Sequence, residues 1–153
     1  MRSPRPVTTM LTVGDPIRFG SGGNYGAFSP QGFAQDDNPT HTWNDGFVAS
    51  ITFQMAAPSA KFYLRIDADP FVVADKVPFQ DLSIYLSGLW IGFTRANRGM
   101  NIAVAVDVEY LAAGDNVLSF VMPNATRPRE IAVGDDVRAL GFAFHEISMS
   151  TKA

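Results

Sequence analysis

The amino-acid sequence predicts an all-β fold, a jelly-roll sandwich built from two sheets. Apolar and polar residues alternate with a period of two along several segments, as expected of half-buried strands. Clusters of Gly, Pro, Asn and Asp separate these segments about every ten residues, the spacing of strands in a sandwich. Aspartate outnumbers glutamate 12 to 3 and arginine outnumbers lysine 9 to 3. Good helix formers are therefore scarce.

The first two long strands are predicted at 47–55 and 62–68. In each segment every second residue is apolar, while the intervening residues are mostly polar. The polar positions of the second segment include Tyr63 and Arg65, which therefore point outward. The expected core positions are Phe47, Ala49, Ile51, Phe53 and Met55 in the first strand and Phe62, Leu64, Ile66 and Ala68 in the second.

The segment 82–93 predicts a β-hairpin whose loop is Ser87-Gly88, a two-residue turn that suits the twist of paired strands. This register places Tyr85 opposite Trp90 on one face. On the other face it pairs Leu86 with Leu89 and Ile84 with Ile91.

The remaining strands are predicted at 101–108, 116–123 and 140–150. In the last one the apolar positions change parity, so a one-residue bulge near His145-Glu146 is needed if all of them are buried. Short helical turns are expected within 108–114 and 128–136. The apolar sets are Ile102, Val104, Val106 and Val108, then Leu118, Phe120 and Met122, then Leu140, Phe142, Phe144, Ile147 and Met149.

Length and charge narrow the class of protein. The 153 residues show one composition throughout, which predicts a single domain over 1–153. A net charge of −3 argues against a nucleic-acid-binding surface. With no cysteine there are no disulfides and no thiolate metal sites. The sequence has neither a signal peptide nor a membrane-spanning stretch, so a cytoplasmic location is the default expectation.

Sequence motifs for catalysis or cofactor binding are weak. The Gly-rich run 20–26 lacks the Lys and the following helix of a phosphate-binding loop, and a turned connection is expected instead. His41 and His145 lie more than a hundred positions apart without ligand spacing. No serine-nucleophile motif is present. No cofactor is therefore expected.

Carboxylates are plentiful in the predicted turns, and three uses are open to them. A structural Ca²⁺ on Asp36, Asp37 or Asp45 fits that ion's preference for oxygen ligands. Capping of turn N–H groups explains the same residues and is favoured over the ion. A pair of carboxylates could also serve a glycoside hydrolase, but Asp-rich turns supply such pairs in any β-sandwich.

The order of short motifs resembles an uncharacterised bacterial β-sandwich domain that is often attached to membrane glycosyltransferases and polysaccharide-assembly proteins. The resemblance covers about residues 11–150, and serine at position 87 departs from the family's asparagine. The chain also stands without the transferase that often accompanies this domain. The matching residues are Trp43, Asp45 and Gly46, then Pro70 and Phe71, then Gly88, then Pro123, Ala125 and Pro128, and finally Asp136, Arg138, Leu140 and Gly141.

The resemblance implies a jelly roll similar to galactose-binding and carbohydrate-binding modules, with no catalytic residue to transfer. We expect glycans to be held by aromatic faces with charged or amide groups nearby. The candidate residues are Tyr85, Trp90, Tyr63, Arg65 and Trp43, the last at the start of the strand that follows it. A glycan site at Tyr85 and Trp90 requires Arg65 within reach of both rings. A cross-strand aromatic pair explains Tyr85 and Trp90 without a ligand and is favoured for them. For Asp136 and Arg138 the favoured interpretation is a structural turn, in which the carboxylate accepts turn N–H groups and pairs with the guanidinium.

The sequence therefore predicts a non-catalytic glycan-recognition or accessory module of bacterial polysaccharide metabolism. Its expected partners are a carbohydrate or a polysaccharide-biosynthesis protein, with neither nucleic acid nor membrane insertion. Two other classes stay open. The first is a jelly-roll subunit that assembles with copies of itself in a capsid or surface layer, and the second, weaker one is a glycoside hydrolase with a carboxylate pair.

Overall fold

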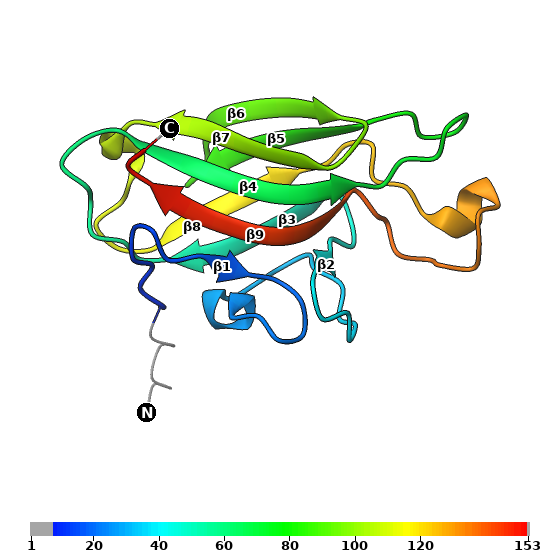
Figure 1. Ribbon diagram of the computed structural model, residues 1–153, viewed down its shortest axis with the longest axis horizontal. Helices are drawn as coiled ribbons and strands as arrows, with labels where there is room; N and C mark the ends of the chain where they lie inside the picture. The colour runs from blue at the N-terminus through cyan, green and yellow to red at the C-terminus, as the bar shows by residue number, and fades with distance from the viewer. Residues whose placement is uncertain (1–7, 153) are drawn as a thin grey trace.

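The computed structural model describes residues 8–152 and shows two antiparallel sheets packed face to face (Figure 1). This confirms the all-β sandwich. The strands are β1 (Ile17–Arg18), β2 (Thr42–Trp43), β3 (Val48–Phe53), β4 (Phe62–Pro70), β5 (Gln80–Leu86), β6 (Leu89–Ala96), β7 (Met100–Val106), β8 (Asn116–Val121) and β9 (Phe142–Ser150). Three short 3₁₀ turns, η1 (Tyr25–Phe28), η2 (Val108–Tyr110) and η3 (Pro128–Ile131), interrupt the loops, the last two within the segments expected to turn.

The strands divide between a five-stranded and a four-stranded sheet. The five-stranded sheet has the order β1-β9-β4-β7, and β2 pairs with β9 beside β1. The four-stranded sheet has the order β3-β8-β5-β6. In Figure 1 the connection from β8 to β9, which contains η3, projects from one end of the sandwich.

The core lies between the sheets and follows the predicted alternation. Phe53, Leu64 and Ile66 are all fully buried and belong to one cluster. Phe47 is an exception, because it is 53% exposed. The strand begins only at Val48, after Gly46 with a φ of 121°, so Phe47 belongs to the preceding turn and is not held over the core.

The expectation that Trp43 opens a long strand is wrong, because Trp43 and Val48 belong to different sheets. Between them the chain crosses the sandwich at Asn44, which is fully buried. Its side-chain amide donates to the carbonyls of Gly46 and Ala139 and accepts the N–H groups of Gly141 and Phe142. All hydrogen-bonding positions of this amide are used, one within its own turn and three on the segment 139–142, which fixes the crossing.

The hairpin between β5 and β6 has the predicted loop, but one of its predicted residue pairs is wrong. Tyr85 lies opposite Trp90 and Leu86 opposite Leu89, as expected. Ile84, however, pairs with Gly92 and not with Ile91, because Ile91 is an extra residue in β6. A side chain at Gly92 would press on Val104 of β7, so the glycine lets the edges of the two sheets approach closely.

The predicted bulge in the last strand is confirmed. Glu146 pairs with Asp67 and Phe144 with Ala68, which leaves His145 as the extra residue in β9. Because the parity changes there, Phe144 and Ile147 are both fully buried. Within residues 8–152 no helix is long and apolar enough to cross a membrane.

Candidate functional site

The five residues predicted to hold a glycan lie on two opposite faces. Tyr85 and Trp90 are on the outer face of the four-stranded sheet, where they alternate with core residues of β5 and β6. Tyr63, Arg65 and Trp43 belong to β4 and β2 of the other sheet. Since the sheets pack core to core, their outer faces point away from each other. The expectation that Arg65 reaches Tyr85 and Trp90 is therefore wrong.

The outer face of the five-stranded sheet carries a row of polar residues that crosses four strands. Arg18 of β1 is the register partner of Glu146 of β9. Glu146 is the partner of Asp67 of β4, and Asp67 is the partner of Asn101 of β7. We call these four residues the polar row. At the spacing of neighbouring strands, the row extends about 14 Å.

The side chains of the polar row make no hydrogen bond or ion pair within the described part of the chain. Beside them, Arg65 makes a single hydrogen bond of 3.4 Å to the carbonyl of Lys152. Several charged residues elsewhere are paired. Arg95, for example, contacts Asp81 through two hydrogen bonds of 2.7 and 3.0 Å. The polar row thus places four unused hydrogen-bonding side chains next to one another on one sheet face.

Three hollows follow this face and share residues. The first, of about 440 Å³, lies between Asp15, Arg18 and the Gly22-Gly23-Asn24 segment. The second, of about 330 Å³, shares Arg18 with the first and extends to His145 and Glu146. The third, of about 240 Å³, shares Glu146 with the second and is also lined by Arg65, Asp67, Asn101 and Ser148. The hollows therefore follow the polar row across the sheet.

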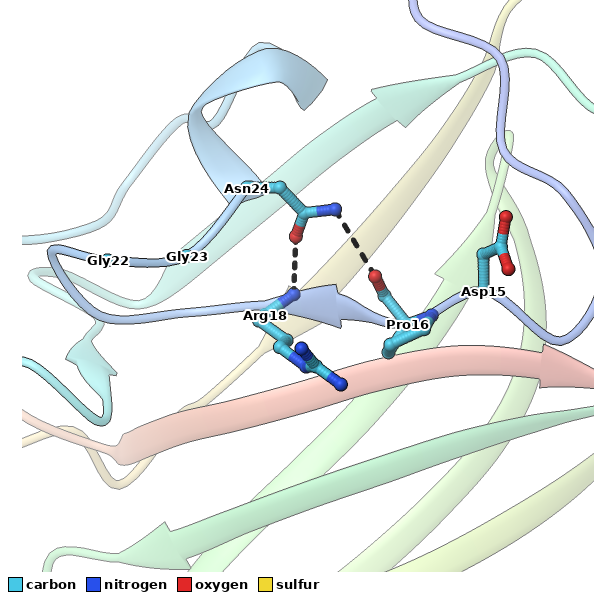
Figure 2. Close-up of a pocket in the computed structure, with 6 residues that line it drawn as sticks. All are labelled: Asp15, Pro16, Arg18, Gly22, Gly23 and Asn24. Atoms are coloured by element: carbon cyan, nitrogen blue, oxygen red, sulfur yellow. Dashed lines mark hydrogen bonds between the residues drawn. The ribbon is translucent and has the colours of Figure 1, made fainter.

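The Gly-rich segment forms one wall of the first hollow, and Figure 2 shows how it is attached. The Asn24 amide accepts the backbone N–H of Arg18 at 2.7 Å and donates to the carbonyl of Pro16 at 3.2 Å. A side chain at Gly23 would collide with the Arg18 backbone. The segment is thus a tight turn laid against β1, consistent with the turned connection expected from the sequence.

Aromatic and imidazole rings flank the polar row near the beginning of β9. The ring of His41 lies 5.5 Å from that of His145 and 6.1 Å from that of Trp43, between ring centroids. The Nε2 atom of His145 is 2.7 Å from a carboxylate oxygen of Asp69. Trp43 also contacts Phe71, at 6.2 Å. This cluster gives the polar face an aromatic boundary.

The two histidines approach each other although they are far apart in sequence. No group of three His, Asp or Glu side chains in residues 8–152 is placed to hold a metal ion.

The three aspartates considered for Ca²⁺ have other contacts. Asp36 accepts the Arg138 guanidinium, and Asp45 accepts the N–H of Ala139. Asp37 contributes its backbone carbonyl to a contact with Ser21.

Asp136 and Arg138 lie in the connection before β9. The carboxylate of Asp136 accepts the backbone N–H of Arg138 at 2.9 Å and its guanidinium at 2.7 to 3.1 Å. The guanidinium also reaches Asp36 at 2.8 Å. The hydrogen bond from the Arg138 side chain lowers the pKa of Asp136, and the same contact raises the pKa of Arg138. These contacts are those of the expected turn, whose structural role stays a prediction.

The sequence interpretation missed Arg18, Glu146, Asn101 and Ser148 as site residues. For Glu146 and Ser148 a signal was available, since the bulge at His145 assigns both to the outward parity of β9. For Arg18 no pattern existed, because β1 has only two residues. Asn101 became a neighbour of Asp67 only through the pairing of β4 with β7.

Comparison with known proteins identifies similar structures but no similar sequence. No protein-family model matches the chain, and no curated protein matches its sequence. The C-terminal family 6 carbohydrate-binding module of LamC, a marine laminarinase from Zobellia galactanivorans, has a TM-score of 0.52 and 9% identity, covering 88% of this chain and 96% of that one. A second family 6 carbohydrate-binding module, studied for its binding sub-sites, has a TM-score of 0.50 and 9% identity, covering 98% and 100%. The chain therefore has the β-sandwich fold of carbohydrate-binding modules.

Proposed function

We propose that the protein is a non-catalytic module that binds a glycan along the polar row. The observation that carries this proposal is the set of unused hydrogen-bonding side chains on one sheet face. Arg18, Glu146, Asp67 and Asn101 lie in register across four strands and have no partner in the described chain. Sugar hydroxyls both donate and accept, so a glycan can satisfy carboxylates, a guanidinium and an amide together.

The charge of the face favours a neutral glycan. Asp15, Asp67 and Glu146 are balanced by Arg18 and Arg65, which leaves one net negative charge along the three hollows. An acidic polysaccharide that approached either arginine would be repelled by the carboxylate beside it. Further along the same sheet, on either side of the row, Trp43 and Tyr63 supply rings for contact with sugar C–H groups. The family 6 modules with this fold support the same ligand class.

The arrangement of the carboxylates favours binding over hydrolysis. Asp67 and Glu146 stand side by side on neighbouring strands of one sheet face. A hydrolase needs its two carboxyl groups on either side of the bond that is cleaved. A glycan that lies on this face contacts both groups from the same side, so they serve as hydrogen-bond acceptors.

The biological setting is part of the proposal. The order of motifs from Trp43 to Gly141 supports a role in bacterial polysaccharide metabolism, with a polysaccharide-biosynthesis protein as a partner. Such a module would hold the polymer near the enzyme that extends or modifies it.

Affinity electrophoresis of the whole chain tests the proposal, in gels that contain laminarin, xylan, galactomannan or hydroxyethylcellulose. We expect at least one polymer to retard the protein, and Glu146→Gln and Asn101→Ala each to weaken this retardation at least tenfold. Glu109→Gln is the matched control, since Glu109 is an exposed carboxylate away from the sheet faces.

Two results would contradict the proposal. Retardation that is absent in all four polymers, or unchanged in both row variants, would exclude the polar row as a glycan site. Release of new reducing ends from any of the polymers would exclude a non-catalytic module and favour the hydrolase.

A further inference from the structure

The outer face of the four-stranded sheet has a different chemistry from the polar row. Two of its outward residues on β6, Trp90 and Phe93, are 57% and 54% exposed. We call this surface the Trp90 face. Its outward residues, by strand register, are Val48, Ser50 and Thr52 on β3, Val117, Ser119 and Val121 on β8, Asp81, Ser83 and Tyr85 on β5, and Trp90, Phe93 and Arg95 on β6.

Three aromatic rings lie together at one side of the Trp90 face. Tyr85 is directly opposite Trp90, and Phe93 is opposite Ser83, the next outward residue of β5. Trp90 and Phe93 are an odd number of residues apart and would face opposite sides of a regular strand. The extra residue at Ile91 changes the parity, so both rings point outward.

The Trp90 face has no unpaired charge. Its only charged residues are Asp81 and Arg95, which are joined by two hydrogen bonds, and the Arg95 guanidinium also lies 3.9 Å from the centre of the Phe79 ring. The face therefore offers neither attraction nor specificity to a charged partner.

The hydroxyl groups of the Trp90 face are unused. Within the described residues, the side chains of Ser50, Ser83 and Ser119 make no hydrogen bond, and neither does the hydroxyl of Tyr85. The surface thus combines aromatic rings for C–H contacts with hydroxyls that can donate or accept. These groups extend over all four strands, so they suit a ligand that presents a broad uncharged face.

We infer that the Trp90 face is a second glycan-contact surface, which takes the broad face of a packed, neutral polysaccharide. The inference shares only its ligand class with the function proposed above, because it uses different residues on the opposite side of the molecule. With one surface for a single chain and one for packed chains, the module can join two polymers. Joining them raises the effective concentration of each at the other surface.

Binding to insoluble particles of microcrystalline cellulose, chitin and curdlan tests this inference with the whole chain. We expect at least one particle to deplete the protein from solution, and Trp90→Ala and Phe93→Ala each to weaken that depletion at least tenfold. Phe47→Ala is the matched control, because Phe47 is equally exposed, at 53%, but precedes β3 and lies outside both sheets. Trp90 and Phe93 are solvent-exposed, so both variants should keep their thermal midpoints.

The outcomes separate the two glycan proposals. Particle binding that survives Glu146→Gln but not Trp90→Ala supports the Trp90 face, whether or not the soluble polymers bind. Depletion that is absent for all three particles, or unaffected by Trp90→Ala and Phe93→Ala, overturns it. Light scattering that shows a concentration-dependent dimer, abolished by Trp90→Ala, would also overturn it and assign the face to a second copy of this chain.

Discussion

Glu146 and Asp67 are direct register partners on β9 and β4, and neither carboxylate has a partner within residues 8–152. Like charges in directly opposed positions of a sheet are destabilising. Arg18 and Asn101, which continue the row on either side, lower the local charge density without forming ion pairs. The glycan proposed above would supply the missing hydrogen-bond donors.

Replacement of Glu146 by Gln should therefore separate stability from binding. We expect the free energy of unfolding to rise by about 0.2–1 kcal/mol, because the repulsion from Asp67 is removed. Urea denaturation measures this gain in stability. We also expect glycan retardation to weaken, which affinity electrophoresis measures. Glu109→Gln should change neither. A Glu146→Gln variant that is less stable than the parent protein would show that the carboxylate has a structural partner.

Phe53 tests the packing of the core between the sheets. Its side chain is fully buried, so Phe53→Ala should lower the free energy of unfolding by about 3–5 kcal/mol. Phe93→Ala removes the same side chain from an exposed site and should change stability by no more than about 0.5 kcal/mol. Equal denaturation midpoints for the two variants would refute the register of β3.

Arg138 tests whether the turn before β9 is structural. Arg138→Ala removes the guanidinium contacts with Asp136 and Asp36, and we expect a loss of about 1–2 kcal/mol because the group is partly exposed. Arg127→Ala is the control, since Arg127 has only a 3.9 Å contact with exposed Glu130. If Arg138→Ala kept its stability and lost glycan binding, the residue would belong to a binding site.

The pH dependence of the same turn follows from the lowered pKa of Asp136. A depressed pKa in the folded state stabilises the protein at pH values above the unfolded pKa of about 3.9. This contribution is lost as the pH falls through the folded value. Asp136→Asn should therefore be less stable than the parent protein at pH 7, and the difference in thermal midpoint should shrink as the pH falls below about 4. A difference that stays constant as the pH falls would argue against a role for the ionised carboxylate.

Two adjacent glycines should respond differently to the same substitution. Gly23→Ala places a methyl group against the Arg18 backbone, whereas Gly22→Ala meets open space. We expect Gly23→Ala to lower the free energy of unfolding by about 1–3 kcal/mol through overpacking and to displace the wall of the first hollow. Gly22→Ala should leave the thermal midpoint unchanged. A similar midpoint for both variants would show that the segment does not pack on β1.

Local sequence patterns were sufficient for the longer strands β3 to β9, but not for the two-residue strands β1 and β2 or for the site. Alternation identified β4 because each core residue, such as Leu64, is followed by an outward residue, such as Arg65. It could not assign Arg65 and Tyr85 to different sheets, since sheet order depends on pairings between distant segments. Alternation also could not show that Trp43 and β3 belong to different sheets. The chain crosses between the sheets at one buried amide, Asn44, and the crossing depends on the hydrogen bonds of that side chain. No periodicity reports such a contact.

The extra residue at His145 changes which side chains of β9 point into the core. Before it, even-numbered residues enter the core, and after it, odd-numbered residues do. If β9 paired regularly through His145, with no residue left out of the ladder, half of the strand would turn over and the carboxylate of Glu146 would enter the apolar interior. The direction in which the polar row faces is thus set by a residue count, and not by any side chain within the row. Those side chains point away from the core, so they can be exchanged for others while the sandwich beneath keeps its packing.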